Sequence, residues 1–73
     1  MIPEIGITEI GIAAGDIWHY LDEKGPAALD DVLRGIGKDR DLLLMSLGWL
    51  AREGHVTVKV QGGKLHAWLN AKS

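Results

Sequence analysis

Two runs of alternating apolar and polar residues flank a pair of glycines near the end of this 73-residue chain. Within residues 55–61 and 64–70 every second side chain is aliphatic, which is the period of a β-strand with one buried face. Gly62-Gly63 supplies the positive φ angles that a two-residue hairpin turn requires. Closing the chain at this turn brings three aliphatic pairs onto one face: Val56 with Leu69, Val58 with Ala67, and Val60 with Leu65. A slip of one residue would separate all three pairs, so the sequence predicts an amphipathic hairpin in this register.

The region before the hairpin carries the 3.6-residue period of helices. Apolar residues recur at this spacing within residues 10–21, which predicts a helix that starts near Thr8 and stops at Gly25-Pro26. Gly11 and Gly15 lie four residues apart inside this helix, and each costs about 1 kcal/mol of helix propensity relative to alanine. We therefore expect a packing reason for the pair, of which the simplest is the close approach of another backbone on that face.

A short connection and a second, shorter helix follow. Residues 26–28 read as an extended link, and the apolar spacing of residues 29–36 predicts a helix with two aspartates in its first turn. Gly35 and Gly37 are expected to end it, since glycine is favoured at helix C-termini.

The third predicted helix completes a helix-turn-helix. Asp39 is its expected N-cap, and the helix runs to about Arg52 before Gly54 stops it. Two short helices joined by a tight glycine-containing turn form the helix-turn-helix motif. With the hairpin as a wing, the order of elements predicts an α+β winged helix-turn-helix domain over residues 8–73, preceded by a loose N-terminal arm over residues 1–7.

Two stretches of the chain resemble the signatures of a known family. Residues 10–18 (IGIAAGDIW) and residues 47–54 (LGWLAREG) are similar to two segments of a small prokaryotic family, the winged helix-turn-helix domain of unknown function. The similarity runs from about Thr8 to the wing, and the Gly-Trp pair of the second segment is rare among winged helices. The resemblance implies a winged-helix fold that self-associates, and it brings no substrate or catalytic residue.

The composition excludes several classes of protein. The absence of cysteine rules out disulfides and thiolate metal sites and favours a cytoplasmic setting, since small secreted domains are often rich in disulfides. The first residues do not have the pattern of a signal peptide, and no apolar run approaches the ~20 residues of a membrane span. The net charge of −2 is uneven, because residues 1–54 carry −5 and residues 55–73 carry +3. Any polyanion is therefore expected to meet the C-terminal segment.

Residues that could carry chemistry have structural explanations. His19, His55 and His66 lack the spacing of paired metal ligands on one element, so solvated or packing roles are expected. Ser46 has no histidine-plus-acid pattern around it. Each acidic pair falls in the first turn of a predicted helix, where it compensates the helix dipole. The sequence therefore predicts no enzyme, no cofactor, no metal site and no small-molecule substrate.

One hypothesis is DNA binding, because the second helix of such a motif commonly enters the major groove and a wing can contact the backbone. The candidate contacts are basic side chains around the third helix and on the wing: Lys38, Arg40, Arg52, Lys59, Lys64 and His66. However, residues 42–51 contain no Arg, Lys, Asn or Gln, which are the side chains best suited to read base edges. Asp39 and Asp41 flank Arg40 and would repel phosphates. Binding through the wing would thus tolerate many sequences, and the alternative is that these charges are ordinary solvated side chains.

The second hypothesis is self-association. A helical wheel of the third helix places its expected core stripe at Leu43, Leu47 and Leu50. Other apolar positions of this helix and the hairpin face opposite the valines supply the candidate interface residues: Leu42, Leu44, Met45, Trp49 and Trp68. A helix that is apolar nearly all round is buried or lies in an interface, and a chain of this length has little material to cover both sides. The alternative is that the first two helices cover the second apolar stripe of this helix, formed by Leu42, Met45 and Trp49, and that Trp68 shields the wing.

Together these patterns predict a non-enzymatic binding module that forms a homodimer and acts in transcription regulation. The pair Gly11 and Gly15 would admit a neighbouring helix at the interface. Two alternatives stay open. One is sequence-tolerant DNA binding through the basic wing, and the other is a protein–protein interaction module with no nucleic-acid role.

Overall fold

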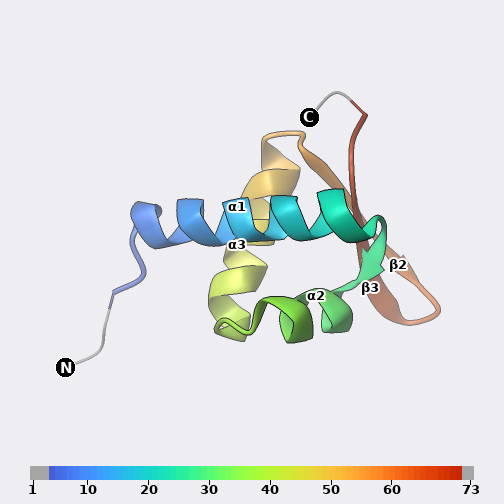
Figure 1. Ribbon diagram of the computed structural model, residues 1–73, viewed down its shortest axis with the longest axis horizontal. Coiled ribbons are helices and arrows are strands. Elements are labelled where there is room, and N and C mark those ends of the chain that lie inside the picture. Colours follow the sequence, from blue (N-terminus) through green and yellow to red (C-terminus); the bar gives the residue numbers. More distant parts are fainter. Residues whose placement is uncertain (1–3, 72–73) are drawn as a thin grey trace.

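Three helices pack with a small antiparallel sheet in the computed structural model, which describes residues 4–71 (Figure 1). The elements follow in the order α1 (Ile7–Lys24), β1 (Ala27–Ala28), α2 (Leu29–Ile36), α3 (Arg40–Arg52), β2 (Val56–Gln61) and β3 (Lys64–Leu69). This order confirms the predicted α+β winged helix-turn-helix fold, with three helices followed by a hairpin wing. The extended link at residues 26–28 holds the short strand β1.

The hairpin has the predicted register. β2 and β3 pair so that the three aliphatic pairs are Val56 with Leu69, Val58 with Ala67, and Val60 with Leu65. Gly62 and Gly63 have φ angles of 58° and 76°, as the two central residues of a type I′ turn require. On its other edge β3 pairs with β1, which gives the strand order β1-β3-β2 and covers one edge of the wing.

The start of α1 is set by a hydrogen bond from the backbone. The N–H of Gly6 donates to a carboxylate oxygen of Glu9 at 2.8 Å, which ties the residue before the helix to its first turn. The helix therefore begins one residue before Thr8, its expected start. The predicted arm over residues 1–7 lies partly outside the described residues, and its described part up to Gly6 forms neither helix nor strand.

The turn between α2 and α3 follows the capping chemistry that the sequence predicts. Gly37 has a φ of 74° and donates its N–H to the carbonyl of Leu33, which ends α2. Asp39 caps α3, because its carboxylate accepts hydrogen bonds from the N–H groups of Asp41 (3.1 Å) and Leu42 (3.2 Å). Both helix ends thus have partners for backbone groups that would otherwise be unpaired.

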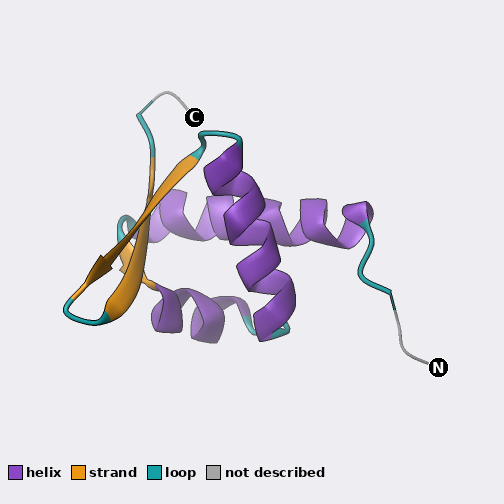
Figure 2. Ribbon diagram, turned by 180° about the vertical axis from the view of Figure 1, so that it is seen from behind, coloured by secondary structure: helices purple, strands orange, loops and turns teal. Residues whose placement is uncertain are grey.

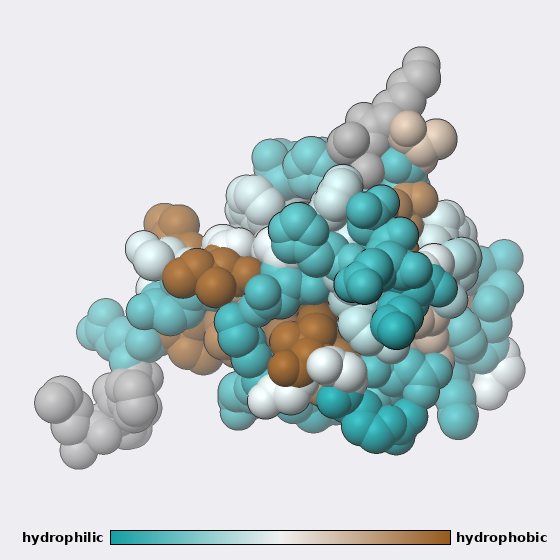
Figure 3. Space-filling view, in the orientation of Figure 1, coloured by the Kyte–Doolittle hydropathy of each residue, from teal (hydrophilic) through white to brown (hydrophobic). Residues whose placement is uncertain are grey.

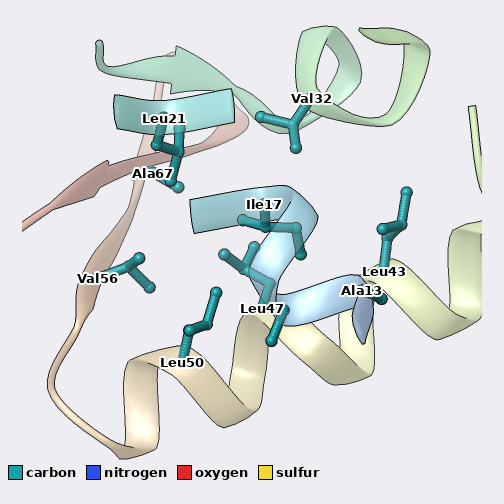
Figure 4. Close-up of a cluster of buried hydrophobic side chains, with 10 residues drawn as sticks. Ala13, Ile17, Leu21, Val32, Leu43, Leu47, Leu50, Val56 and Ala67 are labelled. Atoms are coloured by element: carbon teal, nitrogen blue, oxygen red, sulfur yellow. The ribbon is translucent and has the colours of Figure 1, made fainter. Parts of the chain in front are cut away.

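The core forms where α1 crosses α3, and views from opposite sides agree on this crossing (Figures 1 and 2). Side chains from all three helices and from the hairpin point toward one another there (Figure 4). The fully buried apolar side chains are Ala13, Ala14, Ile17, Leu21, Val32, Leu43, Leu47, Leu50, Val56 and Ala67. The predicted core stripe of α3 is therefore confirmed. The hairpin contributes Val56 and Ala67 from its predicted apolar face, whereas Val58 and Val60 on that face are 37% and 64% exposed, so the expected burial of the whole face is wrong.

The second apolar stripe of α3 divides between core and surface. Met45 and Trp49 are 45% and 48% exposed, whereas Leu44 is half-buried. Leu42 is half-buried and packs against the core. It lies one helical turn before the fully buried Ser46, and this side of α3 faces inward.

Gly35 lies within α2, where its expected role in ending the helix is wrong. A Cβ built on Gly35 would overlap the ring of Tyr20 from α1. The glycine is thus required by a close contact between two helices, which fixes the half-buried tyrosine ring against α2. Only Gly37 ends the helix.

Because of this contact, Gly35→Ala should change the free energy of unfolding in opposite directions when Tyr20 is present and when it is replaced by alanine. Gly35→Ala should lower the free energy of unfolding by about 1–2 kcal/mol, because the added methyl group overpacks against Tyr20. In a Tyr20→Ala background the same change should raise it by about 1 kcal/mol through helix propensity. Urea unfolding of the four proteins at one concentration measures the cycle, and an effect of the same sign in both backgrounds would contradict the contact.

Candidate functional site

Two of the predicted DNA contacts, one at the start of α3 and one at the start of β3, line the same hollow. Arg40, the first residue of α3, lines a hollow of about 220 Å³ together with Lys64 at the start of β3. Asp30 lines the same hollow and reduces its positive charge. The fold therefore brings Arg40 and Lys64 to one site, as a recognition helix and a wing would on a phosphate backbone.

The other predicted DNA contacts are more dispersed. The ammonium group of Lys38 lies 2.5 Å from a carboxylate oxygen of Asp16, so its charge is compensated within the chain. Lys59 and His66 face each other across the hairpin, on the side away from the core. Arg52 lies at the opposite end of α3 from Arg40, about 18 Å away along the helix axis. A contiguous basic surface of all six residues is therefore not formed.

A groove without formally charged side chains runs between α1 and the C-terminal half of α3. We call it the α1–α3 groove; its volume is about 300 Å³ and it is lined by Gly11, Ala14, Gly15, Trp18, Trp49, Leu50 and His55. No side chain, and no backbone of another element, lies within 4 Å of a Cβ built at Gly11 or Gly15. The close backbone approach expected at these glycines thus does not occur within the described chain, and the groove is open.

The first turns of α1 continue this apolar surface beyond the body of the domain. They extend past α3 on the side away from the sheet (Figure 1), and hydrophobic side chains gather over them (Figure 3). Ile5, Ile7 and Ile12 are 43%, 89% and 57% exposed. Ile7 precedes Gly11 by one helical turn and therefore lies on the same side of α1 as the groove.

Trp68 lies apart from the α1–α3 groove. Its half-buried side chain lines a separate hollow of about 700 Å³, which we call the sheet groove. The sheet, α2 and the C-terminal end of α1 border it. Tyr20, whose ring packs against the backbone of Gly35, lines the same hollow. The sequence placed Trp68 and Trp49 in one interface, whereas the two rings line different grooves.

Ser46 and His19, two groups that could act in catalysis or metal binding, make contacts within their own helices. The hydroxyl of the fully buried Ser46 donates to the carbonyl of Leu42 at 2.8 Å, within its own helix. The ring of His19 meets that of Trp18 edge to face at 5.5 Å. Within residues 4–71 no three His, Asp or Glu side chains cluster as metal ligands would, and no helix there has the length and apolarity to cross a membrane.

Residues 4–69 match the sequence profile of a family described as "Winged helix-turn-helix domain (DUF2582)". This chain belongs to that family. A curated relative is "Uncharacterized protein MJ1608" of Methanocaldococcus jannaschii, which is 38% identical over 52 residues that cover 68% of this chain and 74% of that protein. The resemblance seen in the sequence is thereby confirmed.

Solved structures share the fold. Protein BT2368 from Bacteroides thetaiotaomicron aligns with a TM-score of 0.75 at 26% identity, over 85% of this chain and 76% of that one. A structure reported for the DNA recognition and protein interaction domains of HOP2 gives 0.73 at 27% identity, over 80% of this chain and 98% of that one. The Zα domain of PKZ from Carassius auratus, solved with Z-DNA, gives 0.72 at 18% identity, over 84% and 97% of the two chains, and shows the fold alone.

Proposed function

We propose that this chain is a non-enzymatic, cytoplasmic winged-helix binding module that works as a homodimer in transcription regulation, with the α1–α3 groove at the interface. The observation that carries the proposal is the groove itself. Two bare glycines line this groove together with the rings of Trp18 and Trp49, and no Asp, Glu, Lys or Arg lines the space. Tryptophan rings in such positions are the usual anchors of protein interfaces.

A second copy of the chain is the occupant that this geometry favours. In a two-fold arrangement the same patch serves both subunits, so the projecting start of α1 from one copy can cover the groove of the other. The exposed Ile7 and Ile12 then become buried, and the glycine faces let the two α1 backbones approach closely. The absence of formal charge in the groove avoids repulsion between identical surfaces.

The proposal predicts opposite effects of one substitution on folding and on association. Gly11→Ala or Gly15→Ala should stabilise the helix by about 1 kcal/mol, because each site has room for a methyl group within its own chain. The same methyl group should weaken the dimer about tenfold or more by holding the two helices apart. Sedimentation equilibrium gives the dissociation constant, and thermal unfolding at low concentration gives the stability of the monomer.

Glu23→Ala serves as the control, since this exposed residue near the end of α1 does not line the groove. It should leave the dissociation constant unchanged. The proposal is wrong if the unmodified chain sediments as a monomer into the high micromolar range. It is equally wrong if alanine at both glycines stabilises the fold without affecting association.

Sequence-tolerant DNA binding is the second candidate, favoured by the shared position of Arg40 and Lys64. One of the similar structures, that of HOP2, is named for DNA recognition, which supports this candidate for a protein of the same fold. A dimer would present two such sites and so double the positive charge offered to a duplex. The third alternative, a protein-interaction module without any nucleic-acid role, is the outcome if duplex DNA does not bind.

A salt series with duplex DNA tests the second candidate. If Arg40 and Lys64 contact phosphates, replacing both with alanine should reduce the slope of log affinity against log salt by about 2 per subunit. Lys38→Ala is the matched control and should leave the slope unchanged, because Asp16 already compensates this lysine. No measurable binding of the unmodified chain at low salt would exclude DNA contacts for this protein.

A further inference from the structure

We infer that the sheet groove binds a nucleoside phosphate, with its base against the rings of Tyr20 and Trp68 and its phosphate near Lys24 and Arg34. This site is separate from the proposed dimer interface, because the sheet groove and the α1–α3 groove share no lining residue. It also differs from the hollow at Arg40 and the wing tip. The inference therefore does not depend on the proposed function.

The aromatic walls of the groove come from two elements far apart in the sequence. Tyr20 is fixed on one side, because its ring lies directly on the backbone of Gly35. Trp68 and His66 lie two residues apart on β3, and they therefore share the face of the sheet that points away from the core. Both aromatic rings are half-buried and line one hollow, which suits stacking or edge contacts with a planar ring.

The charge around the groove favours an anion. Lys24, Arg34 and His66 line it, and Asp31 is its single carboxylate. That carboxylate already forms an ion pair with Arg34 at 2.5 Å, in which the exposed guanidinium group keeps further donors for a phosphate. Lys24 and Arg34 against Asp31 leave one formal positive charge at this groove, in a chain with a net charge of −2.

The size and polarity of the groove fit the same ligand. A volume of about 700 Å³ lies within the range typical of small-molecule sites. Gln61 contributes an amide that can both donate to and accept from the edge of a base. An uncharged aromatic ligand would leave the cations unused, and an inorganic anion would leave the rings unused, so a ligand that combines both properties fits best.

Titration of the ¹⁵N-labelled 73-residue chain tests the inference, because the three tryptophans give separate indole N–H resonances that single Trp→Phe variants assign. The probes are adenosine 5′-monophosphate, adenosine, inorganic phosphate and a short single-stranded oligonucleotide. We expect the monophosphate to shift the Trp68 indole and the amides of β1 at millimolar concentration, while the indoles of Trp18 and Trp49 stay in place. A response to the oligonucleotide with none to the free nucleotide would support the site and identify single-stranded nucleic acid as the source of the phosphate.

Variants at exposed positions separate specific binding from a change in fold. Lys24→Ala and Arg34→Ala should each weaken the monophosphate about tenfold. Asp31→Ala removes the competing carboxylate and should strengthen binding, whereas Lys38→Ala is the charge-matched control and should have no effect. The inference is overturned if no probe shifts Trp68, if adenosine binds as tightly as its monophosphate, or if inorganic phosphate alone reproduces the response.

Discussion

The crossing of α1 over α3 is the contact on which the rest of this structure depends. Small residues at Ala13 and Ala14 let the two helices approach, and Ile17 then packs with Leu43 and Leu47 in the space beside them. Once this crossing is formed, the hairpin closes the core with Val56 and Ala67. The same crossing determines which sides of the two helices are left outside, and these are the glycine side of α1 and the Met45–Trp49 side of α3.

The apolar character of the exposed side of α3 separates this chain from a typical sequence-reading winged helix. Side chains that recognise base edges are Arg, Lys, Asn and Gln, and the surface here presents Met45, Gly48 and Trp49 instead. The basic residues lie at the two ends of the helix and on the wing, where Asp16 and Asp30 lie beside two of them. The fold provides the positions of a DNA-binding domain, and the side chains at those positions favour apolar contacts.

Features determined by neighbours in the sequence could be predicted from it. The register of the hairpin follows from a period of two residues and a two-glycine turn, and both are local. The cap at Asp39 and the helix end at Gly37 depend on backbone groups within three or four residues. The core stripe of α3 follows from helical periodicity alone, since the most apolar line of a helix faces the interior.

Features that depend on how the elements pack could not be predicted in the same way. Gly35 has the sequence context of a helix end, and only the arrival of Tyr20 from α1 explains it. The hairpin register places Trp68 on the outer face of the sheet. That this face forms a groove depends on α2 and the C-terminal end of α1, which line it. That Arg40 and Lys64 line one hollow likewise depends on how α2, α3 and the hairpin pack, and no periodicity encodes that.

The central claim is that the open glycine side of α1 is completed by a second copy of the chain. An isotope-filtered nuclear Overhauser experiment on an equal mixture of labelled and unlabelled chains tests this most directly. The account predicts contacts between the Hα protons of Gly11 and Gly15 in one copy and the methyl groups of Ile7 or the indole of Trp49 in the other. Intermolecular contacts confined to the wing, or none at millimolar concentration, would contradict it.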